Sequence, residues 1–151
     1  MAYDFRGAWE QTIGHFAAYS EATAAMDLWA SRGFNKSKLV MGIPTFARGW
    51  LADECVIGGA TSGPAPFRPF TGDPGMASNF ELLKFVGKQI STAEGPFLET
   101  TINWSKYCYS YEDRNAVLKK MAFINERGFA GTFTRTLDYE PAEFKLHKAI
   151  V

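Results

Sequence analysis

The first nine residues, Met1 to Trp9, are the stretch that most constrains the fold. Apolar and aromatic residues lead into the carboxylate of Asp4, and a glycine and a tryptophan follow. This order is typical of a buried parallel strand that ends in a ligand-binding loop. Such a strand would present Tyr3 and Asp4 at its carboxyl end. A buried strand also needs a neighbour on each side, so the chain is expected to begin in the middle of a larger sheet.

The next segments predict a helix and a second strand. Residues 21–32 carry apolar side chains at helical spacing, with Ser20 as the expected N-cap and Gly33 as the expected end. Residues 38–45 are a continuous, mostly apolar run, which favours a strand covered on both faces. Strand, helix and strand in this order imply a right-handed parallel unit, so the loop near Gly14 would lie where α/β folds bind ligands.

The remaining chain predicts an insertion followed by two more units. Residues 50–112 hold five of the seven prolines and several glycine turns, and we expect an inserted α+β subdomain with a short helix over 80–89 and an aromatic strand over 104–111. A helix is predicted over 113–127, a strand over 129–137, and a last helix from Pro141 to the end of the chain. The inward side chains expected on the second helix are Val117, Leu118, Met121 and Ile124.

Composition excludes several classes of function. Sixteen basic residues balance sixteen acidic ones without a run of either sign, so neither a nucleic-acid partner nor a membrane partner is expected. No apolar window of membrane-spanning length and no signal peptide occur in the sequence. Cys55 and Cys108 fit a disulfide or two buried thiols equally well. Asn35-Lys36-Ser37 and Asn103-Trp104-Ser105 fit glycosylation acceptors, which permits a secretory origin.

Other common chemistries find no support in the sequence. His15 and His147 are too few and too far apart for a metal site or for the base of a nucleophile, so surface or core roles are expected. The glycines near residue 58 lack the lysine that closes a phosphate loop, and no serine elbow occurs. Asp138 and Glu140 follow a strand at a spacing typical of solvated acids. We therefore expect no cofactor and no metal.

Three motifs together resemble the second half of family 18 glycoside hydrolases, the chitinases and chitinase-like lectins. They are Met1-Ala2-Tyr3-Asp4-Phe5-x-Gly7-x-Trp9, then Lys38 to Arg48, then Tyr111-Glu112-Asp113 before a helix that ends Glu126 to Gly131. The resemblance covers essentially all 151 residues in the family's order. It implies an α/β fold, a partial TIM (β/α)8 barrel resembling strands 6 to 8. Residues 1–49 and 113–151 would form the partial barrel, and 50–112 the α+β insertion.

The resemblance also implies roles for particular residues. Tyr3 matches the tyrosine that donates to the substrate's acetamide, and Asp4 the carboxylate beside it. Trp9 matches a tryptophan that stacks on a sugar ring. Without the resemblance, Tyr3 and Asp4 would be interpreted as a strand end with a solvated acid, and Trp9 as packing on the insertion.

The remaining implied contacts lie after the later strands. Arg48 matches an arginine that hydrogen-bonds the glycan, although the residue type alone also fits a surface charge. Phe46 stands where the family usually has tyrosine, so a hydroxyl donor is lost. Arg135 occupies the position of a tryptophan that floors the central sugar subsite, and arginine cannot reproduce an apolar floor. Met1 is the last residue assigned to substrate binding.

The resemblance predicts binding without catalysis. These enzymes use the substrate's own N-acetyl group as nucleophile, and a glutamate on the fourth strand, which this sequence lacks, protonates the leaving group. The leading hypothesis is therefore the chitin-binding or N-acetylglucosamine-oligomer-binding half of a chitinase-type hydrolase, inactive alone. The alternatives are a non-catalytic chitinase-like lectin, which Arg135 favours, and a truncated gene product without an independent role. Open sheet edges predict self-association, and the family suggests secretion.

Overall fold

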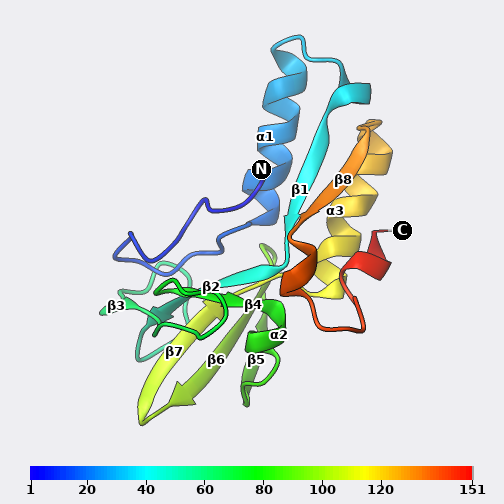
Figure 1. Ribbon diagram of the computed structural model, residues 1–151. Coiled ribbons are helices and arrows are strands. Elements are labelled where there is room, and N and C mark those ends of the chain that lie inside the picture. The colour runs from blue at the N-terminus through cyan, green and yellow to red at the C-terminus, as the bar shows by residue number, and fades with distance from the viewer. Residues whose placement is uncertain (151) are drawn as a thin grey trace.

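The computed structural model describes residues 1–150 and contains two sheets (Figure 1). Strands β1 (Val40–Pro44) and β8 (Gly131–Arg135) form a parallel pair, beside which lie helices α1 (Tyr19–Ser31) and α3 (Arg114–Arg127). The lower part of Figure 1 holds a six-stranded antiparallel sheet. Among the described helices, none combines the length and hydropathy that a membrane crossing requires.

The parallel pair is the centre of one hydrophobic core. Its register runs from Val40 opposite Gly131 to Pro44 opposite Arg135. Buried apolar side chains from both helices and both flanks of the pair surround it: Ala2, Ala22, Met26, Met41, Ile43, Val117, Ile124, Phe129, Leu146 and Ala149. The continuous apolar run of residues 41–43 fits this environment because the strand is covered on both faces.

One residue, Thr45, lies between the end of β1 and the first strand of the antiparallel sheet. Strand β2 (Phe46–Leu51) pairs with β7 (Ser105–Ser110), β4 (Met76–Ser78) and β3 (Gly63–Pro64), and β6 (Pro96–Ile102) joins β7 to β5 (Gly87–Ser91). A disulfide between Cys55 and Cys108 ties the loop after β2 to β7. Only Thr45 separates the two sheets, so strand-end residues of β1 and the first residues of β2 lie together.

Several predicted elements are confirmed. The predicted helices and strands over 21–32, 38–45, 104–111, 113–127 and 129–137 correspond to α1, β1, β7, α3 and β8. At the start of α3, the Ala116 amide donates to Asp113 Oδ1 at 2.8 Å, and Gly128 ends the helix at φ 70°. One inward residue was wrong: Leu118 is exposed, and Lys120 is buried instead.

Three further local predictions are wrong. Residues 1–4 are assigned to no helix or strand, and they pair with no described strand. The predicted helix over 80–89 is only α2 (Asn79–Leu82), because residues 87–91 pair with β6 as β5. The expected N-cap Ser20 lies inside α1, whose N-cap is Ala18, and the Ser20 amide donates to Glu94 Oε2 at 2.9 Å.

The predicted last helix is also replaced by shorter turns. In its place stands one short 3-10 segment, η3 (His147–Ala149). Two other 3-10 segments are η1 (Lys36–Lys38) before β1 and η2 (Leu137–Tyr139) after β8. The Glu140 carboxylate accepts hydrogen bonds from the amides of Leu146 and His147 at 2.8 and 3.0 Å. These bonds close residues 140–147 into a loop. Val151, the end of the predicted helix, lies outside the described residues.

Candidate functional site

A bidentate ion pair joins Asp4, in the amino-terminal stretch, to Arg48 of β2. Arg48 Nε donates to Asp4 Oδ1 at 2.8 Å and Nη2 donates to Oδ2 at 2.9 Å. Asp4 has φ 60°, a left-handed conformation that directs its side chain at the guanidinium. The Asp4 side chain is 34% exposed. Because each carboxylate oxygen can accept more than one hydrogen bond, this carboxylate still has acceptor capacity toward a ligand.

Trp9 forms an exposed aromatic face beside this ion pair. Its side chain is 61% exposed, and the Arg48 guanidinium carbon lies 5.3 Å from its ring centroid. Gly7 allows this placement, since a Cβ at residue 7 would lie 2.2 Å from the Trp9 ring. The Gly7 carbonyl in turn accepts a hydrogen bond from Trp50 Nε1 at 3.1 Å, which fixes the backbone below the tryptophan.

Tyr3 and Phe46 form the buried side of the site. Their rings pack edge to face with centroids 5.7 Å apart, and the Arg48 guanidinium carbon lies 5.3 Å from the centroid of the Phe46 ring. Tyr3 Oη is buried without a hydrogen-bond partner among the described residues. Burial raises the pKa of this phenol, an effect that the charge of Arg135 opposes and Asp4 reinforces. The Tyr3 hydroxyl is therefore protonated, and it donates a hydrogen bond to no described group.

The other two predicted residues lie in different positions. Arg135 is exposed at the end of β8, opposite Pro44, and its charge acts on Tyr3. Met1 is 86% exposed and lines a separate surface groove with Trp29, Phe34 and Val40. The structure thus gathers Tyr3, Asp4, Trp9, Phe46 and Arg48, with Arg135 at the border and Met1 in another groove.

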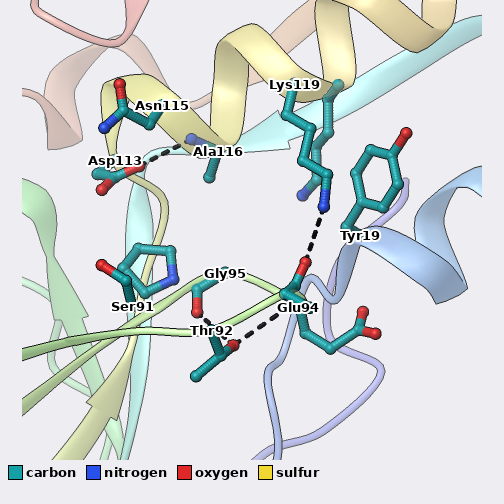
Figure 2. A pocket seen from close by; sticks show the side chains of 12 residues that line it. Tyr19, Ser91, Thr92, Glu94, Gly95, Asp113, Asn115, Ala116 and Lys119 are labelled. Atoms are coloured by element: carbon teal, nitrogen blue, oxygen red, sulfur yellow. Dashed lines mark hydrogen bonds between the residues drawn. The ribbon is translucent and has the colours of Figure 1, made fainter.

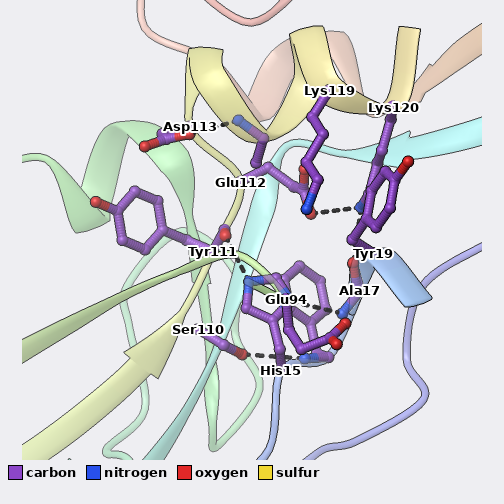
Figure 3. Close-up of polar contacts among 12 residues, drawn as sticks. His15, Ala17, Tyr19, Glu94, Ser110, Tyr111, Glu112, Asp113, Lys119 and Lys120 are labelled. Carbon is purple, nitrogen blue, oxygen red and sulfur yellow. Dashed lines mark hydrogen bonds and ion pairs between the residues drawn. The ribbon is translucent and has the colours of Figure 1, made fainter. Parts of the chain in front are cut away.

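A buried polar network supports the loop behind the site (Figure 3). Lys120 Nζ donates to Glu112 Oε1 at 2.6 Å and to the Ala17 carbonyl at 2.7 Å. His15 bridges the Ala17 amide and the Tyr111 carbonyl, at 3.2 and 3.0 Å. Burial raises the pKa of Glu112, and Lys120 opposes this. Sequence reasoning named Glu112 only as part of a motif and missed Lys120, because helical spacing alone does not reveal a buried lysine.

His15 is held neutral in this network. Burial, followed by the charge of Lys120, lowers the pKa of its imidazole to about 4. Of the two roles expected for His15, the structure shows the core role, since the residue is 3% exposed. The network links α3, the strand end after β7 and the loop before α1. It is a structural support rather than a second reactive centre, because its polar groups contact mainly one another.

A small pocket lies beside this network (Figure 2). It has a volume of about 210 Å³ and is lined by the hairpin between β5 and β6, the first turns of α3 and Tyr19. Lys119 Nζ donates to the Ala93 carbonyl at 2.9 Å and lies 3.9 Å from the Tyr19 ring centroid. Glu94 accepts from both the amide and the hydroxyl of Ser20. The charged groups here are already engaged by protein partners.

No alternative reactive cluster emerges from residues 1–150. Glu140, which sequence reasoning treated as a solvated acid, is 6% exposed and accepts two backbone amides. In this same range, no three His, Cys, Asp or Glu side chains lie close enough together to hold a metal ion. The group around Asp4 and Arg48 is therefore the candidate site.

Fold and site together define an open α/β protein whose polar and aromatic groups gather where parallel strands end. The chain belongs to the glycosyl hydrolases family 18, whose family model matches residues 1–140. Within residues 1–150 the two sheets do not close into a ring, so the fold is a partial TIM barrel of this family.

Similar proteins agree with this assignment. An endochitinase of Brugia malayi is 30% identical over 160 residues, covering 93% of this chain and 31% of the relative. An immunomodulatory active chitinase of Trichuris suis superposes with a TM-score of 0.82 at 27% identity, covering 93% of this chain and 42% of that one. Human YKL-39, described as a pseudo-chitinase with retained chitooligosaccharide binding, superposes with a TM-score of 0.85 at 23% identity, covering 99% and 48%. The chain thus spans about a third of the curated relative's length and under half of the solved structures.

Proposed function

We propose that residues 1–151 form the chitin-binding or N-acetylglucosamine-oligomer-binding half of a chitinase-type hydrolase and do not hydrolyse the glycan alone. The observation that carries this proposal is the Asp4–Arg48 ion pair, which lies beside the exposed ring of Trp9 and directly follows Tyr3, whose hydroxyl has no partner among the described residues. The chitooligosaccharide binding described for YKL-39 supports the same ligand class.

Each group in the site has a distinct task toward such a sugar. Trp9 offers a flat apolar face to the C–H face of a pyranose ring. Tyr3 Oη is protonated and has no hydrogen-bond partner among the described residues, so it would donate to the carbonyl of an N-acetyl group once the ligand displaces the side chains that cover it. Asp4 accepts from a sugar hydroxyl or amide while Arg48 holds its carboxylate in place. Holding the acetamide is a positioning task, which these residues can perform without a general acid.

The carboxylates near the site are poorly suited to protonate a leaving group. Asp4 is paired with Arg48, Glu112 with Lys120, and Glu140 accepts two backbone amides. A general acid must keep its proton until it donates it to the glycosidic oxygen, so it needs a raised pKa at a position that the substrate can reach. Glu112 has a raised pKa, but its side chain is fully buried. We therefore expect binding without cleavage.

A non-catalytic chitinase-like lectin is the second candidate. Arg135 favours it, because an exposed arginine replaces the apolar floor expected at the central sugar. An extracellular setting suits both candidates, since the Cys55–Cys108 disulfide persists in oxidising compartments. The two differ in the whole parent protein: an acid glutamate encoded upstream would favour the hydrolase, and its replacement would favour the lectin.

Binding measurements on site variants test the proposal. Titration of the chain with N-acetylglucosamine oligomers in a calorimeter should show saturable binding. We expect Trp9→Ala to weaken it about tenfold and Tyr3→Phe about three- to tenfold, from lost stacking and a lost hydrogen bond. Trp104→Ala is the matched control, because Trp104 is 99% exposed at the turn between β6 and β7. Equal affinities for all four chains, or no binding at all, would refute the proposal.

A further inference from the structure

A row of aromatic rings continues from the candidate site onto the antiparallel sheet. The rings of Phe46 and Tyr139 pack edge to face with their centroids 6.4 Å apart, and the centroids of Tyr139 and Phe70 are 5.8 Å apart. Phe70 in turn packs against Phe80 at 4.8 Å. Tyr139 lies in η2 just after β8, and the Phe70 ring connects it to Phe80 of α2. The row thus joins two parts of the chain that are far apart in sequence.

The outer ring of this row is accessible. Phe70 is 50% exposed and Tyr139 half-buried, whereas Phe46 is 3% exposed beneath Arg48. Phe70 packs against Phe80 and Tyr139 and still leaves half of its surface in contact with solvent, so a ligand can reach it. The Phe70 ring contacts Tyr139, and Tyr139 contacts Phe46 of the candidate site. A long oligomer bound at Trp9 and Asp4 could therefore extend toward Phe70.

A buried carboxylate holds the loop that carries Phe70. Glu81 is 5% exposed, and its Oε1 accepts the Phe70 amide at 2.8 Å. Its Oε2 accepts the amide and hydroxyl of Ser78, each at 3.0 Å. Glu81 therefore closes the capping box of α2 and fixes the backbone of Phe70 with the same carboxylate. A platform ordered before binding loses little entropy when a ligand stacks on it.

We propose that Phe70 and Tyr139 form an additional sugar-stacking position, which binds a further N-acetylglucosamine unit of the same oligomer. This inference rests on the proposed function and names how far the site extends. Phe70 supplies the flat face, and Tyr139 adds a phenol with donor and acceptor capacity beside it. The position supplies an aromatic surface near the strand end where Arg135 replaces the expected tryptophan.

The dependence of affinity on oligomer length tests this extension. Calorimetric titrations of the 151-residue chain with the N-acetylglucosamine disaccharide and hexasaccharide would be repeated for Phe70→Ala, Phe70→Tyr and Phe67→Ala. We expect Phe70→Ala to weaken hexasaccharide binding about three- to tenfold and to leave disaccharide binding unchanged. Phe70→Tyr keeps the ring and should keep the affinity. Phe67, 60% exposed in the same loop, is the matched control and should have no effect.

The outcomes separate this inference from the proposed function. If the unsubstituted chain binds neither oligomer, both are overturned. If it binds both and Phe70→Ala leaves the ratio of the two affinities unchanged, only the additional position is overturned. An equal loss for both oligomers in Phe70→Ala would also overturn it, because that result assigns Phe70 a general structural effect. A loss confined to the hexasaccharide and rescued by Phe70→Tyr supports it.

Discussion

Gly7 controls where the Trp9 ring lies. A Cβ at residue 7 would lie 2.2, 2.3 and 2.6 Å from three atoms of that ring. Since Trp9 is mostly exposed, its ring can swing away at little cost, so Gly7→Ala should change the free energy of unfolding by less than about 1 kcal/mol. Oligomer affinity should nevertheless fall toward that of Trp9→Ala. Thermal unfolding and calorimetric titration check both parts, and an unchanged affinity would contradict this placement of Trp9.

His15 makes stability depend on pH. The pKa of its imidazole is about 4 in the folded chain and near 6.5 when unfolded. The unfolded chain therefore binds the proton first, and stability present above pH 6.5 is lost as the pH falls toward 4, by up to about 3 kcal/mol. Urea unfolding across this range should show a slope that His15→Gln reduces. Identical slopes would mean that His15 is not buried neutral.

At the scale of elements, the disulfide supports the loop that follows Trp9. Ile13 exchanges hydrogen bonds with Gly58 and Gly59, and Thr61 donates to the Gln11 carbonyl, so the loop after Cys55 braces residues 11–13. Reduction should lower the free energy of unfolding by about 2–5 kcal/mol and weaken oligomer binding. The double variant Cys55→Ser, Cys108→Ala should behave like reduced protein and no longer respond to reductant. Equal free energies of unfolding for the oxidised and reduced chains would show that the disulfide does not stabilise the fold.

Elements with both a local pattern and local end signals were predictable. The second long helix has Asp113 before it and Gly128 after it, and the structure uses both. The predicted helix over 80–89 failed because its apolar spacing carried no information about β6, with which residues 87–91 pair. Residues 1–4 show the same limit, since a strand exists only where a partner strand lies beside it.

The candidate site was predictable to the extent that its residues lie in recognisable motifs. Tyr3, Asp4, Phe46 and Arg48 were identified from two such stretches, and the structure brings them together. Tyr139 was not identified, because its role depends on a contact with Phe70 across the fold. Lys120 was missed for a related reason: its burial requires Glu112 and the Ala17 carbonyl, which only the tertiary structure supplies.

At the scale of the whole molecule, open sheet edges predict self-association. Within residues 1–150, β1 and β8 pair only with each other, and Val40 and Phe133 on them are 47% and 40% exposed. Such edges and apolar surface favour pairing with another chain. Light scattering after size-exclusion chromatography should show dimers or larger species, which Phe133→Lys reduces and Val86→Lys does not. A monomer with one sharp cooperative unfolding transition would contradict this prediction.

The central claim is that these 151 residues bind N-acetylglucosamine oligomers without cutting them. The most direct measurement incubates the purified chain with the tetrasaccharide and follows both saturable binding and the appearance of shorter products. The account predicts saturable binding, weakened by Trp9→Ala, with the tetrasaccharide recovered intact. Shorter products that accumulate in proportion to the amount of chain, or the absence of binding, would contradict it.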